Sequence, residues 1–146
     1  MTSRLYPDRP FLAASVAVVR SGKILLAART SEPNAQVFSL PGGIVEAGET
    51  LEAAALRELA EETGVIAEIV GFNGFREVID RDEVGRARRH FVIASFAARW
   101  IAGEGEPSEE AAAILWVDLE EAAALQLTRE LIPLLERAHD MVGAAT

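Results

Sequence analysis

Three glutamates with the spacing of a metal site lie in the most regular helical stretch of the sequence. Glu58, Glu61 and Glu62 share one face of a helix with about 3.6 residues per turn. Their like charges repel one another, and they stand in the last helical turn, where the dipole disfavours anions. Because the chain has no cysteine and no clustered histidines, carboxylates favour a hard cation such as Mg²⁺. A solvated acidic face is the alternative.

The segment that leads into this helix is a glycine-containing loop. Pro41, Gly42 and Gly43 should break any regular element, and the two glycines let the backbone approach a ligand closely. Arg57 on the helix is placed to pair with Glu49 and to hold the loop, although an exposed arginine is the alternative. A magnesium site of this kind points to phosphate chemistry, in which the metal polarises a phosphoryl oxygen and activates water.

The elements that must position these residues can be read from hydrophobic spacing. The clearest helix spans 51–63, with Thr50 as N-cap and Gly64 in the left-handed position at its end. Its expected core-facing stripe is Ala53, Leu56, Leu59, Ala60 and Thr63. We also predict strands over 11–19, 23–28, 65–70, 72–79, 90–100 and 114–117, a charged loop over 81–89, and helices over 119–124 and 129–142 that begin after Asp118 and Thr128. Strands mixed with a central and a terminal helix predict an α/β sandwich.

Length and composition limit the functions open to the chain. Its 146 residues predict one domain over 1–146. A formal net charge of −9 argues against a nucleic-acid polymer as partner, because such binding depends on a basic surface. No apolar run is long enough to span a membrane, and no signal peptide is evident. We therefore expect a cytoplasmic protein. A homodimer is possible from the sequence.

The glycine loop and the acidic helix together resemble a known signature. Gly43 is followed after five residues by Glu49, and after seven more by Arg57-Glu58-Leu59-Ala60-Glu61-Glu62-Thr63-Gly64-Val65. This pattern over residues 43–65 is similar to the Nudix box without a departure. Two further stretches also resemble the family, namely Leu40-Pro41-Gly42-Gly43 and Trp116-Val117-Asp118-Leu119. The chain resembles the small bacterial Nudix hydrolases called MutT-like or ADP-ribose pyrophosphatase-like.

The resemblance implies a fold, a reaction and roles for individual residues. The fold is the Nudix α/β/α sandwich, with a mixed β-sheet between helices. The reaction is hydrolysis of a nucleoside diphosphate linked to another group, with Mg²⁺ or with Mn²⁺ as its substitute. Glu58 and Glu62 are implied as metal ligands, Glu61 as a ligand or the catalytic base, and the Gly43 carbonyl as a further ligand. Glu49 and Arg57 are implied as the pair that holds the loop, and Gly64 as a structural residue of the box.

The substrate is less well defined, because motifs of several subgroups are missing. Asp80 stands where ADP-ribose-hydrolysing members often carry proline, and Arg81 stands where dinucleoside polyphosphate hydrolases often carry tyrosine. A nucleoside triphosphate or an ADP-ribose-like compound is the expected small nucleotide substrate. A nucleotide-binding sensor domain of the same fold, without hydrolysis, is the alternative function.

Several residues outside the box are candidates for substrate binding, each with a structural alternative. We predict that Arg29, Arg81, Arg88 and Arg89 bind the substrate phosphates. For the three arginines of the charged loop, the alternative is a solvated hairpin in which they pair with its own acidic residues. Phe38 is placed to stack on a base or to pack in the core. Glu109 and Glu110 lie where some family members place an extra ligand or base, although an exposed acidic loop is favoured.

Overall fold

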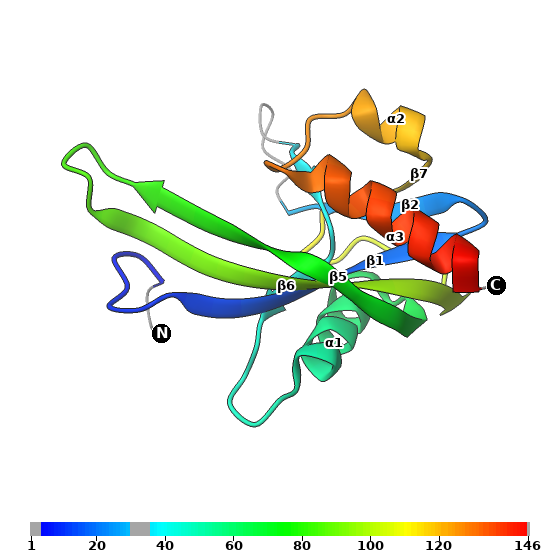
Figure 1. The fold of residues 1–146 in the computed structure, drawn as a ribbon, viewed down its shortest axis with the longest axis horizontal. Helices are drawn as coiled ribbons and strands as arrows, with labels where there is room; N and C mark the ends of the chain where they lie inside the picture. Colours follow the sequence, from blue (N-terminus) through cyan, green and yellow to red (C-terminus); the bar gives the residue numbers. More distant parts are fainter. Residues whose placement is uncertain (1–3, 30–35, 146) are drawn as a thin grey trace.

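One mixed sheet runs through the protein, and helices cover both of its faces (Figure 1). The computed structural model describes residues 4–29 and 36–145. In these ranges the strands are β1 (Phe11–Arg20), β2 (Lys23–Ala28), β3 (Phe38–Ser39), β4 (Gly42–Ile44), β5 (Ile66–Arg81), β6 (Ala87–Ala102) and β7 (Ala113–Val117). The helices there are α1 (Leu51–Thr63), α2 (Leu119–Ala123) and α3 (Leu131–Ala145).

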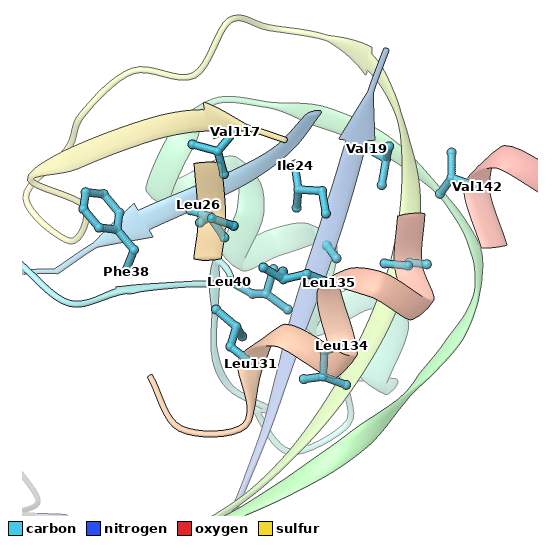
Figure 2. Close-up of a cluster of buried hydrophobic side chains, with 14 of the residues drawn as sticks. Val19, Ile24, Leu26, Phe38, Leu40, Val117, Leu131, Leu134, Leu135 and Val142 are labelled. Carbon is cyan, nitrogen blue, oxygen red and sulfur yellow. The ribbon is translucent and has the colours of Figure 1, made fainter. Parts of the chain in front are cut away.

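Strand β1 lies at the centre of the sheet. It runs parallel to β6 and antiparallel to β2 and β4, and the main path of the sheet is β3-β2-β1-β6-β5. Residues of β1 alternate between two cores. Val16 and Val18 join the core under α1, whereas Ala17 and Val19 join the core under α3, which Figure 2 shows. The predicted α/β/α sandwich with a mixed sheet is therefore confirmed.

Helix α1 has the predicted ends but not the predicted buried face. The Thr50 side chain accepts from the Ala53 N–H at 3.1 Å, and Gly64 takes a φ of 74°. Ala53 and Ala60, expected in the core, are exposed. The helix is turned so that two of its glutamates face inward, and its buried residues are Ala54, Ala55, Glu58, Leu59, Glu62 and Thr63. The alternative interpretation, a solvated acidic face, is therefore wrong for Glu58 and Glu62, which are buried.

Strands β5 and β6 form a long hairpin that reaches past the helices (Figure 1). The two strands predicted over 65–70 and 72–79 are one strand, because irregular pairing near Gly71 and Gly74 absorbs the break. The predicted charged loop over 81–89 is shorter, since Arg81 and residues 87–89 belong to the strands. We call residues 75–93 the arm.

The glycine segment and the C-terminal helix also differ from expectation. Gly42 and Gly43 do not interrupt the sheet but form β4, in which Gly43 pairs with Ala14 of β1. Helix α3 begins at Leu131, so Thr128 is not its N-cap. Thr128 instead holds the chain against β3, where its hydroxyl donates to Ser39 Oγ at 2.9 Å. Within residues 4–29 and 36–145, none of the helices has the length and apolar character that spanning a bilayer requires.

Candidate active site

The glycine strand β4 lies directly against helix α1. A Cβ atom on Gly43 would overlap the Glu58 carboxylate, and one on Gly42 would overlap the Ala14 carbonyl oxygen of β1. Only glycine leaves the room that this approach needs. The glycines of the sequence motif therefore bring the backbone of β4 into contact with the acidic helix.

Glu62 is the most deeply buried of the three helix glutamates, with 2% of its surface exposed. Its Oε2 accepts the Gly42 N–H at 2.8 Å, and Arg29 Nη2 lies 3.7 Å from its Oε1. Burial raises the pKa of Glu62 to about 7, although the Gly42 N–H and Arg29 act in the opposite direction. Arg29 also donates to the Gly42 carbonyl at 2.9 Å, so this predicted substrate residue lies at the site.

Three carboxylates converge beside this contact. One oxygen from each of Glu58, Glu61 and Glu110 lies within 4.8 Å of the others. Burial raises the pKa of Glu58, and the neighbouring Glu110 and Glu61 raise it further, whereas Arg57 lowers it. A metal-free cluster of like charges is unfavourable, and a bound cation would relieve it. These residues fit a hard divalent cation, because oxygen ligands without thiol or imidazole are what Mg²⁺ and Mn²⁺ prefer.

Glu110 reaches the cluster because its loop is tied to the end of α1. Ser108 Oγ donates to the Glu62 carbonyl at 2.7 Å, and the Glu106 N–H donates to the Thr63 carbonyl at 2.9 Å. A cavity of about 240 Å³ opens here, lined by Glu61, Ser108, Glu109 and Glu110. Glu110 therefore belongs to the acidic cluster, whereas Glu109 does not. The alternative of an exposed acidic loop describes Glu109 but leaves out the contact that Glu110 makes.

Arg57 clamps the loop that precedes α1, as the sequence predicts. Its Nε and Nη2 donate to the two oxygens of Glu49 at 2.6 and 2.9 Å, and Nη2 also donates to the Ile44 carbonyl at 3.1 Å. The bidentate contact lowers the pKa of Glu49 to about 2. Arg57 Nη1 further lies 3.2 Å from Glu61 and 3.4 Å from Glu58. The clamp thus joins β4, the loop and the acidic cluster.

The remaining predicted substrate residues lie elsewhere. Arg88 and Arg89 both contact Asp80 on the arm, at 2.9 and 3.1 Å, and Arg81 donates to the Gly85 carbonyl. This arrangement matches the alternative of a self-paired hairpin. The role of Arg81, Arg88 and Arg89 in phosphate binding stays a prediction. Phe38 is only 6% exposed and packs in the core under α3. This position agrees with the alternative of core packing rather than with stacking on a base.

Comparison with known proteins identifies the family. The model of the NUDIX domain matches residues 9–138. An ADP-ribose pyrophosphatase of Methanocaldococcus jannaschii is 36% identical over 129 residues, which cover 88% of this chain and 73% of that protein. An RNA pyrophosphohydrolase of Caulobacter vibrioides is 33% identical over 150 aligned positions, and the match covers 94% of this chain and 87% of that protein. The chain belongs to the Nudix family and is a Nudix hydrolase that acts on phosphorus anhydrides.

A solved structure agrees with this assignment. The MutT NUDIX hydrolase from Burkholderia pseudomallei superposes with a TM-score of 0.75 at 30% identity, and the match covers 89% of this chain and 98% of that one. The resemblance inferred from the sequence is therefore confirmed for both the family and the fold.

Proposed function

We propose that this protein is a divalent-metal-dependent pyrophosphohydrolase that cleaves the diphosphate linkage of a nucleoside diphosphate derivative. The observation that carries the proposal is the convergence of Glu58, Glu61 and Glu110 beside Gly43. Mg²⁺ is the proposed ion and Mn²⁺ its substitute, because both accept several carboxylate oxygens together with water and phosphate.

The proposed metal ligands are the Glu58 and Glu110 carboxylates of this cluster and the Gly43 carbonyl, and Glu61 is a ligand only if Glu110 acts as the base. A bound ion would polarise a phosphoryl oxygen and lower the pKa of the attacking water. Glu62, the further ligand that the resemblance implies, holds the Gly42 N–H in this structure and so fixes β4 against α1. Arg57 donates hydrogen bonds to Glu49, to the Ile44 carbonyl and to Glu61. These contacts fix the position of Glu61 relative to β4 and so orient the cluster.

Glu61 is the proposed base that takes a proton from water. It belongs to the cluster and lines the cavity, and about half of its side chain is exposed, so a substrate and water can reach it. Glu110 faces the same cavity from the opposite loop and is the alternative base. Arg29, with 71% of its side chain exposed, is placed to contact the diphosphate beside Gly42.

The substrate class is narrowed by the relatives and by charge. The Methanocaldococcus relative is named for ADP-ribose, which supports an ADP-ribose-like diphosphate. The Caulobacter relative is named for RNA, but the net charge of −9 favours a small nucleotide over a polymer. The sensor alternative has less support, because every acidic residue of the box is present. A cytoplasmic location and a single domain over 1–146 stay predictions.

A substrate panel tests the proposal. ADP-ribose, deoxynucleoside triphosphates, NADH, dinucleoside polyphosphates and nucleotide sugars are each incubated with Mg²⁺ or Mn²⁺, and release of the nucleoside monophosphate, phosphate or pyrophosphate is measured. We expect turnover of at least one compound, and a loss of at least about 100-fold in kcat for Glu61→Gln. Binding without release, in the presence of either metal, would support the sensor alternative instead.

A further inference from the structure

The segment between β6 and β7, residues 103–112, carries Glu110 and crosses directly over the end of α1; we call it the Glu110 loop. A Cβ atom on Gly103 would lie 2.7 Å from the Gly64 carbonyl oxygen, and Gly103 has a φ of 91°, so only glycine fits this crossing. Further along, Ser108 and Ala111 exchange backbone hydrogen bonds of 2.9 and 3.2 Å, and Ala111 is fully buried. Glu110 therefore stands in a closed turn whose position depends on how the rest of the loop is held.

Two tryptophans from different strands hold the first residues of the Glu110 loop. Trp100 of β6 donates its indole N–H to the Gly103 carbonyl at 2.7 Å, and Trp116 of β7 donates its own to the Glu104 carbonyl at 2.7 Å. Both rings pack against the core under α1, so each N–H is a donor in a fixed place. The hydrogen bonds to α1 hold the middle of the loop, and these two hold its start.

Arg20 at the end of β1 stabilises the pair of indoles from outside. Its guanidinium carbon lies 3.8 Å from the centroid of the Trp100 ring and 5.7 Å from that of Trp116. Arg20 Nη1 also donates to the Glu104 carboxylate at 3.0 Å. The Glu104 side chain is 77% exposed, and exposed ion pairs contribute little. The two indole N–H groups are therefore the side-chain contacts that fix the start of the loop.

We propose that Trp100 and Trp116 are positioning residues for Glu110. Their indole N–H groups fix the start of the Glu110 loop, and its closed turn then presents the Glu110 carboxylate to Glu58 and Glu61. The inference rests on the proposed function, in which Glu110 is a metal ligand or the alternative base. Removal of an outer group that orients the ligands of a metal ion commonly costs about 10–100-fold in metal affinity or activity.

The test is Trp116→Phe, which removes the donor to the Glu104 carbonyl and keeps an aromatic ring against the core. In the metal-free variant, amide hydrogen exchange of residues 104–111 should be faster than in the wild type. The dissociation constant of Mn²⁺, measured by calorimetry, should rise at least about fivefold, and kcat on the best substrate of the panel should fall at least about tenfold.

Glu104→Gln is the matched control. It breaks the exposed ion pair with Arg20 but leaves the carbonyl to which the Trp116 indole donates. Its loop exchange, Mn²⁺ dissociation constant and kcat should all stay within about twofold of the wild type. Circular dichroism shows whether Trp116→Phe folds, and Trp100→Phe repeats the test at the Gly103 carbonyl if it does not.

A purely structural role would lower the melting temperature of Trp116→Phe and leave its Mn²⁺ dissociation constant and kcat unchanged, and that result would overturn the inference. An equal effect of Glu104→Gln would also overturn it, because the ion pair rather than the indole would then hold the loop. A wild type that binds no Mn²⁺ and turns over no compound of the panel would instead overturn the proposed function. Faster loop exchange in metal-free Trp116→Phe would even then show that the indole holds the Glu110 loop.

Discussion

Replacing Glu62 by glutamine should stabilise the metal-free protein at alkaline pH. Burial raises the pKa of Glu62 from 4.5 to about 7 in the folded chain, so the folded state binds this proton more tightly than the unfolded state does. The contribution of Glu62 to stability is therefore greatest below about pH 4.5 and is lost as the pH rises through 7. The difference between the two pKa values corresponds to about 3 kcal/mol, at ~1.4 kcal/mol per pH unit.

The assay is urea unfolding in EDTA at pH 5 and pH 8. Glutamine keeps an oxygen that can accept the Gly42 N–H but carries no charge. The free energy of unfolding of Glu62→Gln should exceed that of the wild type by less than about 1 kcal/mol at pH 5 and by up to about 3 kcal/mol at pH 8. Glu52→Gln is the control, because it removes one carboxylate from the exposed first turn of the same helix, outside the acidic cluster. Its difference from the wild type at pH 8 should be smaller than that of Glu62→Gln.

Millimolar Mg²⁺ should stabilise the wild type and Glu62→Gln by similar amounts at pH 8, because the proposed ligands are present in both proteins and an ion that binds only the folded state adds RT ln(1 + [Mg²⁺]/Kd). The reasoning is refuted if Glu62→Gln is less stable than the wild type at pH 8 in EDTA. It is equally refuted if the difference between the two proteins does not change between pH 5 and pH 8.

Three further predictions concern the loop, the clamp and the arm. Gly43→Ala should lower kcat by at least about 100-fold with the fold retained by circular dichroism, because its methyl group displaces the Glu58 carboxylate; normal kcat would show that the approach is not needed. Arg57→Lys should lower kcat/KM by at least about tenfold, because lysine cannot make the bidentate contact; an unchanged kcat/KM would remove its positioning role. Replacing Arg88 and Arg89 together by alanine should raise KM about tenfold with little change in kcat, as loss of a charged phosphate contact does; an unchanged KM would leave the pair as hairpin residues.

The local signals of the sequence were sufficient for the ends of helix α1 and for the clamp. The N-cap at Thr50 and the left-handed Gly64 depend on neighbours within four residues, so their chemistry is visible in the sequence. The contact between Arg57 and Glu49 spans eight residues and follows from the direction of one helix and its loop. Such short-range contacts are the ones that residue types and spacing define.

Long-range packing decides what the sequence did not show. Glu58 and Glu62 face inward because the backbone of β4 meets them there, and that meeting depends on the pairing of β4 with β1. Glu110 joins the cluster because Ser108 ties its loop to the end of α1, 46 residues away in sequence. Acidic residues in a polar loop carry no pattern that indicates such a partner. Only the resemblance to the family offered this loop as a site.

The most direct test of the account is metal-dependent turnover by a pair of neighbouring variants. Glu110→Gln removes a carboxylate of the cluster, whereas Glu109→Gln removes one from the same cavity that is not part of the cluster. On the best substrate of the panel, with millimolar Mg²⁺, we predict that Glu110→Gln loses at least about 100-fold in kcat while Glu109→Gln stays within about threefold of the wild type. We also predict that EDTA abolishes turnover by the wild type. Full activity in EDTA, or equal activity of Glu110→Gln and the wild type, would contradict the account.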